Sequence, residues 1–159
     1  MPGSGTFRES DPSEAVDLVD RKLLHGVLRA FRRVDGVSIR PVQEGLEGLS
    51  RKERSAARRA VPHVWIGRPR WYRRSVTVNV WGVDGDTVAG TLAGAGFDAP
   101  ESHVGVGGTC TFRFPNDVAA DELVRFCLSA LQALGARPAG GRWEYSQTVE
   151  VDTTGPAGS

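Results

Sequence analysis

Histidine and cysteine are scarce in this chain, which has three histidines and two cysteines among 159 residues. A metal centre needs three or four converging His, Cys, Asp or Glu ligands. The spacing of His25, His63 and His103 does not place any two of them on one face of a helix or strand. We therefore expect no metal ion and no other cofactor. Cys110 and Cys127 form no CxxC motif and fall among apolar residues, so we expect two buried, reduced thiols.

Long apolar runs are also absent. The sequence has no stretch of about 18 apolar residues that could cross a membrane, and its N-terminal region has no apolar core of a signal peptide. We therefore expect a cytoplasmic protein with no membrane partner. The composition, 40% hydrophobic and 25% charged, is ordinary for a globular protein. Small and polar residues at both ends predict disordered tails over 1–12 and 152–159, and a single α+β domain over 13–151.

Apolar residues recur at intervals of three and four between Ser13 and Arg33, and this spacing predicts an amphipathic helix. Ser13 follows a proline and is a suitable N-cap for that helix. The segment from Val37 to Val42 is typical of a short strand. Pro41 cannot donate a hydrogen bond to a neighbouring strand, so we expect this strand at a sheet edge.

A second helix is predicted after Ser50, which forms a capping box with Glu53 three residues later. Pro62 ends the helical pattern. The segment between them has few apolar residues and many arginines. We therefore expect a basic helix on the protein surface.

The periodicity changes to two in the second half of the chain, which indicates strands with one apolar face each. Two helices are predicted between these strands. This order favours an α+β fold, an antiparallel sheet with helices on one face, whose C-terminal part is compatible with a ferredoxin-like βαββαβ unit. The inward apolar positions of the strands are Val76, Val78, Val80, Cys110, Phe112, Phe114, Trp143, Tyr145, Val149 and Val151.

Basic residues are concentrated in one part of the chain. Between Arg21 and Arg74, fifteen arginines or lysines accompany four acidic residues, whereas both flanking parts are acidic. Such segregation indicates an anionic partner, or a fold in which the oppositely charged parts face each other. Arginines and aromatic rings are interleaved in segment 50–74, a combination that binds single-stranded RNA or DNA and also dominates protein interfaces. The candidate binding residues are Arg54, Arg58, Arg59, Arg68, Arg70, Trp71, Tyr72, Arg73 and Arg74.

No catalytic constellation stands out. The stretch from Gly105 to Thr109 is glycine-rich like a phosphate loop, but it precedes a predicted strand, whereas phosphate loops open a helix. We therefore expect a turn or bulge there. Glu101, Ser102 and His103 are adjacent, while the members of a catalytic triad come from different elements so that their side chains can converge.

We therefore expect a non-enzymatic protein-binding or adaptor module, of the chaperone or immunity type, with an acidic protein as its partner. One alternative is the binding of RNA or single-stranded DNA through segment 50–74. Another is a small enzyme that uses Glu101 and His103 together with Asn79 and Arg113 on nearby strands. In a further interpretation, the basic segment is only a charged hairpin with solvated arginines.

Overall fold

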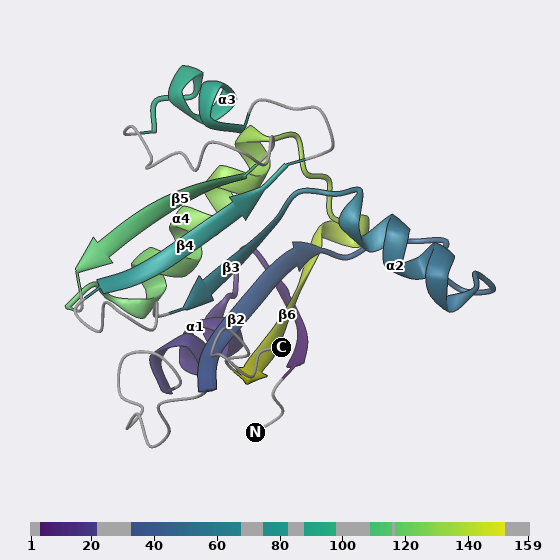
Figure 1. Cartoon of the computed structure of the whole chain (residues 1–159), viewed down its shortest axis with the longest axis horizontal. Helices are drawn as coiled ribbons and strands as arrows, with labels where there is room; N and C mark the ends of the chain where they lie inside the picture. The colour runs from purple at the N-terminus through teal and green to yellow at the C-terminus, as the bar shows by residue number, and fades with distance from the viewer. Residues whose placement is uncertain are drawn as a thin grey trace, which may run out of the picture.

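A computed structural model describes residues 4–21, 33–67, 75–82, 88–97, 109–115 and 117–151. Six strands form one antiparallel sheet in the order β1-β6-β2-β3-β4-β5 (Figure 1). The strands are β1 (Ser4–Arg8), β2 (Arg33–Pro41), β3 (His63–Gly67), β4 (Ser75–Trp81), β5 (Thr109–Pro115) and β6 (Arg142–Val151). The helices are α1 (Ser13–Val19), α2 (Arg51–Arg59), α3 (Val88–Gly94) and α4 (Ala120–Ala133), and a short 3-10 turn, Ala139–Gly141, precedes β6.

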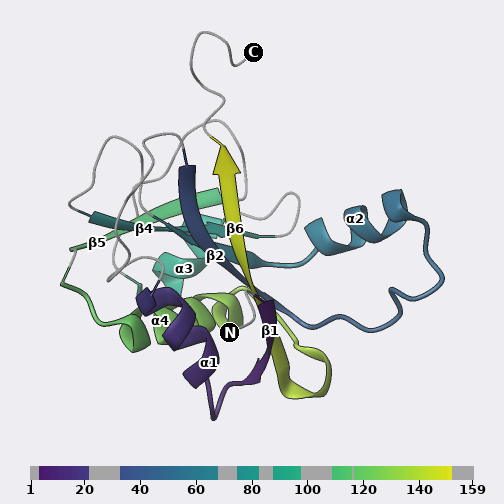
Figure 2. The same ribbon diagram turned by 90° about the horizontal axis from the view of Figure 1, so that it is seen from below.

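Helices α1, α3 and α4 pack on one face of the sheet (Figure 2), which confirms the predicted α+β fold with helices on one side. The strand order does not confirm a ferredoxin-like unit. In that unit, strands joined through a helix run parallel with another strand between them. Here β4 and β5 are joined through α3, yet they pair directly and run antiparallel.

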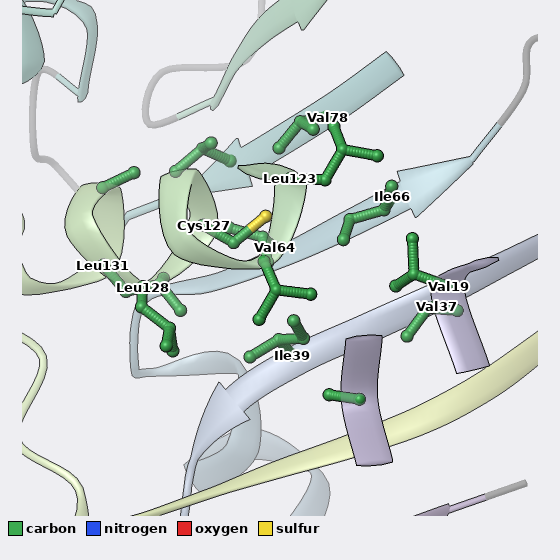
Figure 3. Close-up of a cluster of buried hydrophobic side chains, with 14 of the residues drawn as sticks. Val19, Val37, Ile39, Val64, Ile66, Val78, Leu123, Cys127, Leu128 and Leu131 are labelled. Atoms are coloured by element: carbon green, nitrogen blue, oxygen red, sulfur yellow. The ribbon is translucent and has the colours of Figure 1, made fainter. Parts of the chain in front are cut away.

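The core lies between the sheet and α4 (Figure 3). It contains the inward valines of β4, as the alternation predicts, and Trp143 of β6, which is 1% exposed. Cys110 and Cys127 are both buried and unbridged, in agreement with the prediction. Other fully buried side chains come from α1, β2, β3 and α4: Leu18, Val19, Val37, Ile39, Val64, Ile66, Leu123 and Leu131.

The N-terminal region departs from the prediction. Ser4–Arg8 forms β1, so the expectation of a disordered tail over 1–12 is wrong for these residues. Phe7 is buried opposite Trp143 of β6, and this pairing joins the two ends of the chain, where local sequence gives no signal for it. Residues 1–3 and 152–159 lie outside the described residues. That residues 13–151 form a single domain remains a prediction.

The boundaries and the cap of the first helix differ from the prediction. Pro12 occupies the N-cap position, and the Ser13 hydroxyl donates instead to Asp11 Oδ1 at 2.8 Å, so Ser13 does not cap α1. The helix is described over Ser13–Val19. Residues 22–32 lie outside the described residues, and Arg33 belongs to β2, so the helix cannot extend as far as predicted.

The predicted edge position of the strand around Pro41 is also wrong, because β2 lies between β6 and β3. Its ladder with β3 ends where Ile39 pairs with Val64. Pro41, the last residue of β2, lies beyond that point, so no hydrogen bond of this ladder depends on its nitrogen. No helix in the described part of the chain is long and apolar enough to cross a membrane.

Candidate functional site

Helix α2 is the element that the sequence patterns predict best, and it occupies an unusual place in the fold. The Ser50 hydroxyl accepts from the Glu53 amide at 3.1 Å, and Glu53 Oε1 accepts from the Ser50 amide at 3.3 Å. The predicted capping box therefore exists. The helix has no buried residue and projects away from the sheet in both views (Figures 1 and 2).

The C-terminal end of α2 is held by side chains of the β2 region. Gln43 Nε2 donates to the Ala57 carbonyl at 3.0 Å, and Arg40 Nη1 donates to the Arg58 carbonyl at 3.4 Å. The Ala57 carbonyl also accepts from the Ala60 amide at 3.2 Å, so the two side-chain donors add to the hydrogen bonding of the last turn. Both ends of α2 are thus fixed by hydrogen bonds, although its side chains contribute nothing to the core.

Glu144 of β6 links this end of α2 to the sheet. Its Oε1 accepts a charge-assisted hydrogen bond from Arg58 Nη2 and lies 3.7 Å from Arg40 Nε. Arg40 and Glu144 are paired residues in the β2–β6 ladder. The pKa of Arg40 is lowered by burial and by the charge of Arg58, while Glu144 opposes this shift. The single carboxylate of Glu144 therefore faces two guanidinium groups, and the cluster of these three side chains keeps a net positive charge.

The remaining cations of α2 have no such partner. All four are exposed, and none forms an ion pair or a side-chain hydrogen bond with any residue that the structure describes. Glu53, the acidic residue of the helix, is engaged in the capping box. The outer surface of α2, hereafter the α2 cation surface, therefore carries a local excess of positive charge. It consists of Arg51, Lys52, Arg54 and Arg59.

The sheet face turned away from α1, α3 and α4 carries no described helix (Figure 2). Here the rings of His63 and Trp81, paired across β3 and β4, stack with centroids 5.1 Å apart and planes 10° apart. His63 Nδ1 lies 3.0 Å from the Val61 carbonyl. Burial lowers the pKa of His63, and the charges of Arg40 and Arg58 lower it further, against the hydrogen bond to Val61.

Trp65 lies flat on the same face, across two glycines. A Cβ added at Gly36 or at Gly67 would overlap the indole ring, and these two glycines are paired across β2 and β3. Next to Trp65 in the ladder is Asn79, whose Oδ1 accepts from the Thr111 hydroxyl at 2.8 Å. Aromatic rings and short polar groups therefore alternate on this face, close to the anchored end of α2.

The structure places only part of the predicted binding set. Arg54, Arg58 and Arg59 all lie on α2, and Arg58 is tied to Glu144. The other candidates lie outside the described residues: Arg68, Arg70, Trp71, Tyr72, Arg73 and Arg74. Sequence analysis missed Arg40 and Glu144, because only the register between β2 and β6 brings them together.

The enzymatic alternative gains no catalytic group here. Glu101 and His103 lie outside the described residues, and Asn79 is engaged with Thr111. Within the described ranges, no group of three or more His, Cys, Asp or Glu side chains is placed to hold a metal ion. Comparison of the chain with protein-family models, curated proteins and solved structures finds no match. What the α2 region can do is therefore inferred from its own residues.

Proposed function

We propose that this chain is a non-enzymatic protein-binding module that docks an acidic protein partner onto the α2 cation surface. The observation that carries the proposal is α2 itself. The helix is fixed at both ends and buries no residue, and four of its cations have no carboxylate partner among the described residues.

The energetics of a short helix support this interpretation. A helix of nine residues is marginal in water on its own, and most surface helices are stabilised by an apolar face that packs on the core. Because α2 lacks such a face, its order depends on the capping box and on the donors from Arg40 and Gln43. An ordered helix reduces the conformational entropy that a partner must overcome on docking. The fixed helix is thus suited to present charge rather than to stabilise the core.

Acidic partners fit this surface because its charges are exposed and on one helix. Exposed charges at the edge of an interface mainly accelerate association, and they do so less as salt increases. Since arginine forms bidentate hydrogen bonds with carboxylates, the three arginines of the surface would also orient an acidic segment.

Single-stranded nucleic acid is a second candidate, supported by a separate observation. Trp65 and the stacked pair of His63 and Trp81 lie on the sheet face close to Arg40. Proteins that bind single strands combine such rings, which stack on bases, with cations that contact phosphates. This candidate requires the sheet face as well as α2, whereas docking of an acidic protein requires α2 alone.

The experiment is a quantitative affinity pull-down from source-cell extract, analysed by mass spectrometry with and without nuclease. The bait proteins are the wild type, an α2 variant and a charge-matched control variant. In the α2 variant, Gln replaces Arg51, Lys52, Arg54 and Arg59. In the control, Gln replaces four exposed arginines elsewhere, Arg8, Arg21, Arg125 and Arg142.

We expect to capture acidic proteins with the wild type and with the control, and to recover at least about tenfold less of them with the α2 variant. Nuclease should not change the amounts captured. If every captured protein binds all three baits equally, the proposal is wrong. If capture disappears with nuclease, nucleic acid is the ligand. In that case, log K for a labelled oligo-dT should fall linearly with log salt, by about 0.7 per phosphate contacted.

A further inference from the structure

A pocket lies beside the anchored end of α2, where three connections of the fold meet. Its volume is about 560 Å³, which is in the range of small-molecule sites. Its walls are formed by Pro41 at the end of β2 with residues 42–44 after it, by residues 60–62 between α2 and β3, and by residues 135–137 and Ala139 after α4. The pocket is separate from the exposed cations that carry the proposed docking.

Two opposite charges line this pocket without pairing. Glu44 and Arg137 are both exposed, and neither forms an ion pair with the other or with any other described residue. An anion and a cation held apart in one pocket are complementary to a ligand that carries both charges. A zwitterion can place its carboxylate on the guanidinium and its ammonium on the carboxylate at the same time.

One residue of the pocket wall, Gln43, is held by the end of α2. Its Nε2 donates to the Ala57 carbonyl at 3.0 Å. A carbonyl can only accept, so this contact fixes which end of the Gln43 amide faces α2. Oε1 is enclosed and has no hydrogen-bond partner. Because Oε1 is buried, it does not face the open space of the pocket, and Gln43 contributes a wall that is fixed relative to α2.

The rest of the lining is apolar, contributed chiefly by Pro41, Val61, Pro62 and Ala136. We propose that this pocket binds a small zwitterion with an apolar side chain, namely a free α-amino acid or a dipeptide. Its carboxylate pairs with Arg137, and its ammonium pairs with Glu44. The apolar side chain packs between the prolines. The end of a protein chain offers only one of the two charges and does not meet this requirement.

The test is a titration of the full ¹⁵N-labelled chain followed by NMR. The ligands are leucine and the dipeptide Leu-Leu, and the controls are N-acetyl-leucine, which lacks the ammonium, and leucinamide, which lacks the carboxylate. We expect the amide signals of Gly135, Ala136 and Ala139 to shift with leucine or Leu-Leu. Either blocked compound should bind at least about tenfold more weakly.

Matched variants locate the site. Arg137→Gln and Glu44→Gln should each weaken binding about tenfold, while Arg125→Gln and Glu122→Gln, exposed charges away from the pocket, should leave it unchanged. The proposal is overturned if neither zwitterion shifts these signals at ~10 mM. It is equally overturned if the blocked compounds bind as well as leucine, because the paired charges would then play no role. The comparison of ligands uses only the wild type, so it decides the matter even if a variant is unstable.

Discussion

The carboxylate of Glu144 should be the strongest single electrostatic contributor to the anchoring of α2. Glu144→Gln preserves the size of the side chain and an acceptor oxygen but removes the charge. Two guanidinium groups, those of Arg40 and Arg58, then remain side by side without a counter-charge. We expect the variant to be less stable than the wild type and its α2 to be less protected from hydrogen exchange.

The magnitude follows from the exposure of the three side chains. Arg58 is 37% exposed and Glu144 27%, so their pair approaches the surface case, which contributes at most about 1 kcal/mol. Arg40 is only 19% exposed, and leaving a fully buried charge unpaired costs about 3 to 5 kcal/mol. The half-buried site lies between these limits, so we expect a loss of about 2 kcal/mol. With a urea m-value of about 2 kcal/mol per M, the unfolding midpoint should fall by about 1 M.

Urea unfolding, followed by tryptophan fluorescence, measures this shift. The matched control is Asp121→Asn, which removes a carboxylate from an exposed i,i+4 pair with Arg125 at 3.6 Å. Such pairs contribute at most about 0.5 kcal/mol, so the control should barely change the midpoint. If Glu144→Gln shifts the midpoint no more than the control, or raises it, the assignment of Glu144 as the anchor of α2 is refuted.

Three further predictions concern the sheet and the core. Gly67→Ala should destabilise the wild type by about 1 to 3 kcal/mol, because the new methyl group overlaps the Trp65 ring. In a Trp65→Ala background the same substitution should cost much less. If a double-mutant cycle gives the same loss of stability in both backgrounds, the Trp65 ring does not lie over Gly67. The pKa of His63 is lowered in the folded state, so unfolded chains bind the proton first, and stability should fall as pH drops below about 6.5. His63→Gln should reduce this loss of stability, which is measured as the urea midpoint between about pH 7.5 and 5. If the midpoint of the variant falls with pH as steeply as that of the wild type, the prediction is wrong. Burial raises the pKa of Cys110 to about 11 and also raises that of Cys127, so neither thiol should react with a thiol reagent until the protein unfolds, and rapid native labelling would contradict this.

Local signals explain which parts of the fold could be predicted from sequence. The capping box of Ser50 and Glu53 and the alternation along β4 depend on neighbours within a few residues, and both are present in the structure. Strand β1 was missed because its partner β6 lies at the other end of the chain. Pro41 was misplaced because the rule for edge strands considers the whole strand, whereas the ladder between β2 and β3 already ends at Ile39, before the proline.

In the candidate site, too, local features could be predicted from sequence and long-range contacts could not. The arginines of α2 follow from composition and helix periodicity, and the strand alternation predicts that His63 and Trp65 share a face. The pairing of Arg40 with Glu144 depends on the register between strands that are distant in sequence. No local pattern encodes that register, so the anchor of α2 could not be identified from the sequence. The same holds for the pocket, whose walls come from three separate connections.

The charge segregation of the sequence allowed two interpretations, an anionic partner or internal neutralisation, and each applies to a different part of α2. At the C-terminal end, Arg58 crosses to Glu144 in the acidic C-terminal part of the chain, so this arginine holds the helix in place. The remaining cations have no such acid among the described residues, and these four carry the proposed docking. A substitution of Arg58 would therefore change the orientation of α2 together with its charge, and a loss of binding would be ambiguous. Substitutions at Arg51, Lys52, Arg54 and Arg59 leave the anchor intact, which makes them the direct test of whether the surface of α2 binds a partner.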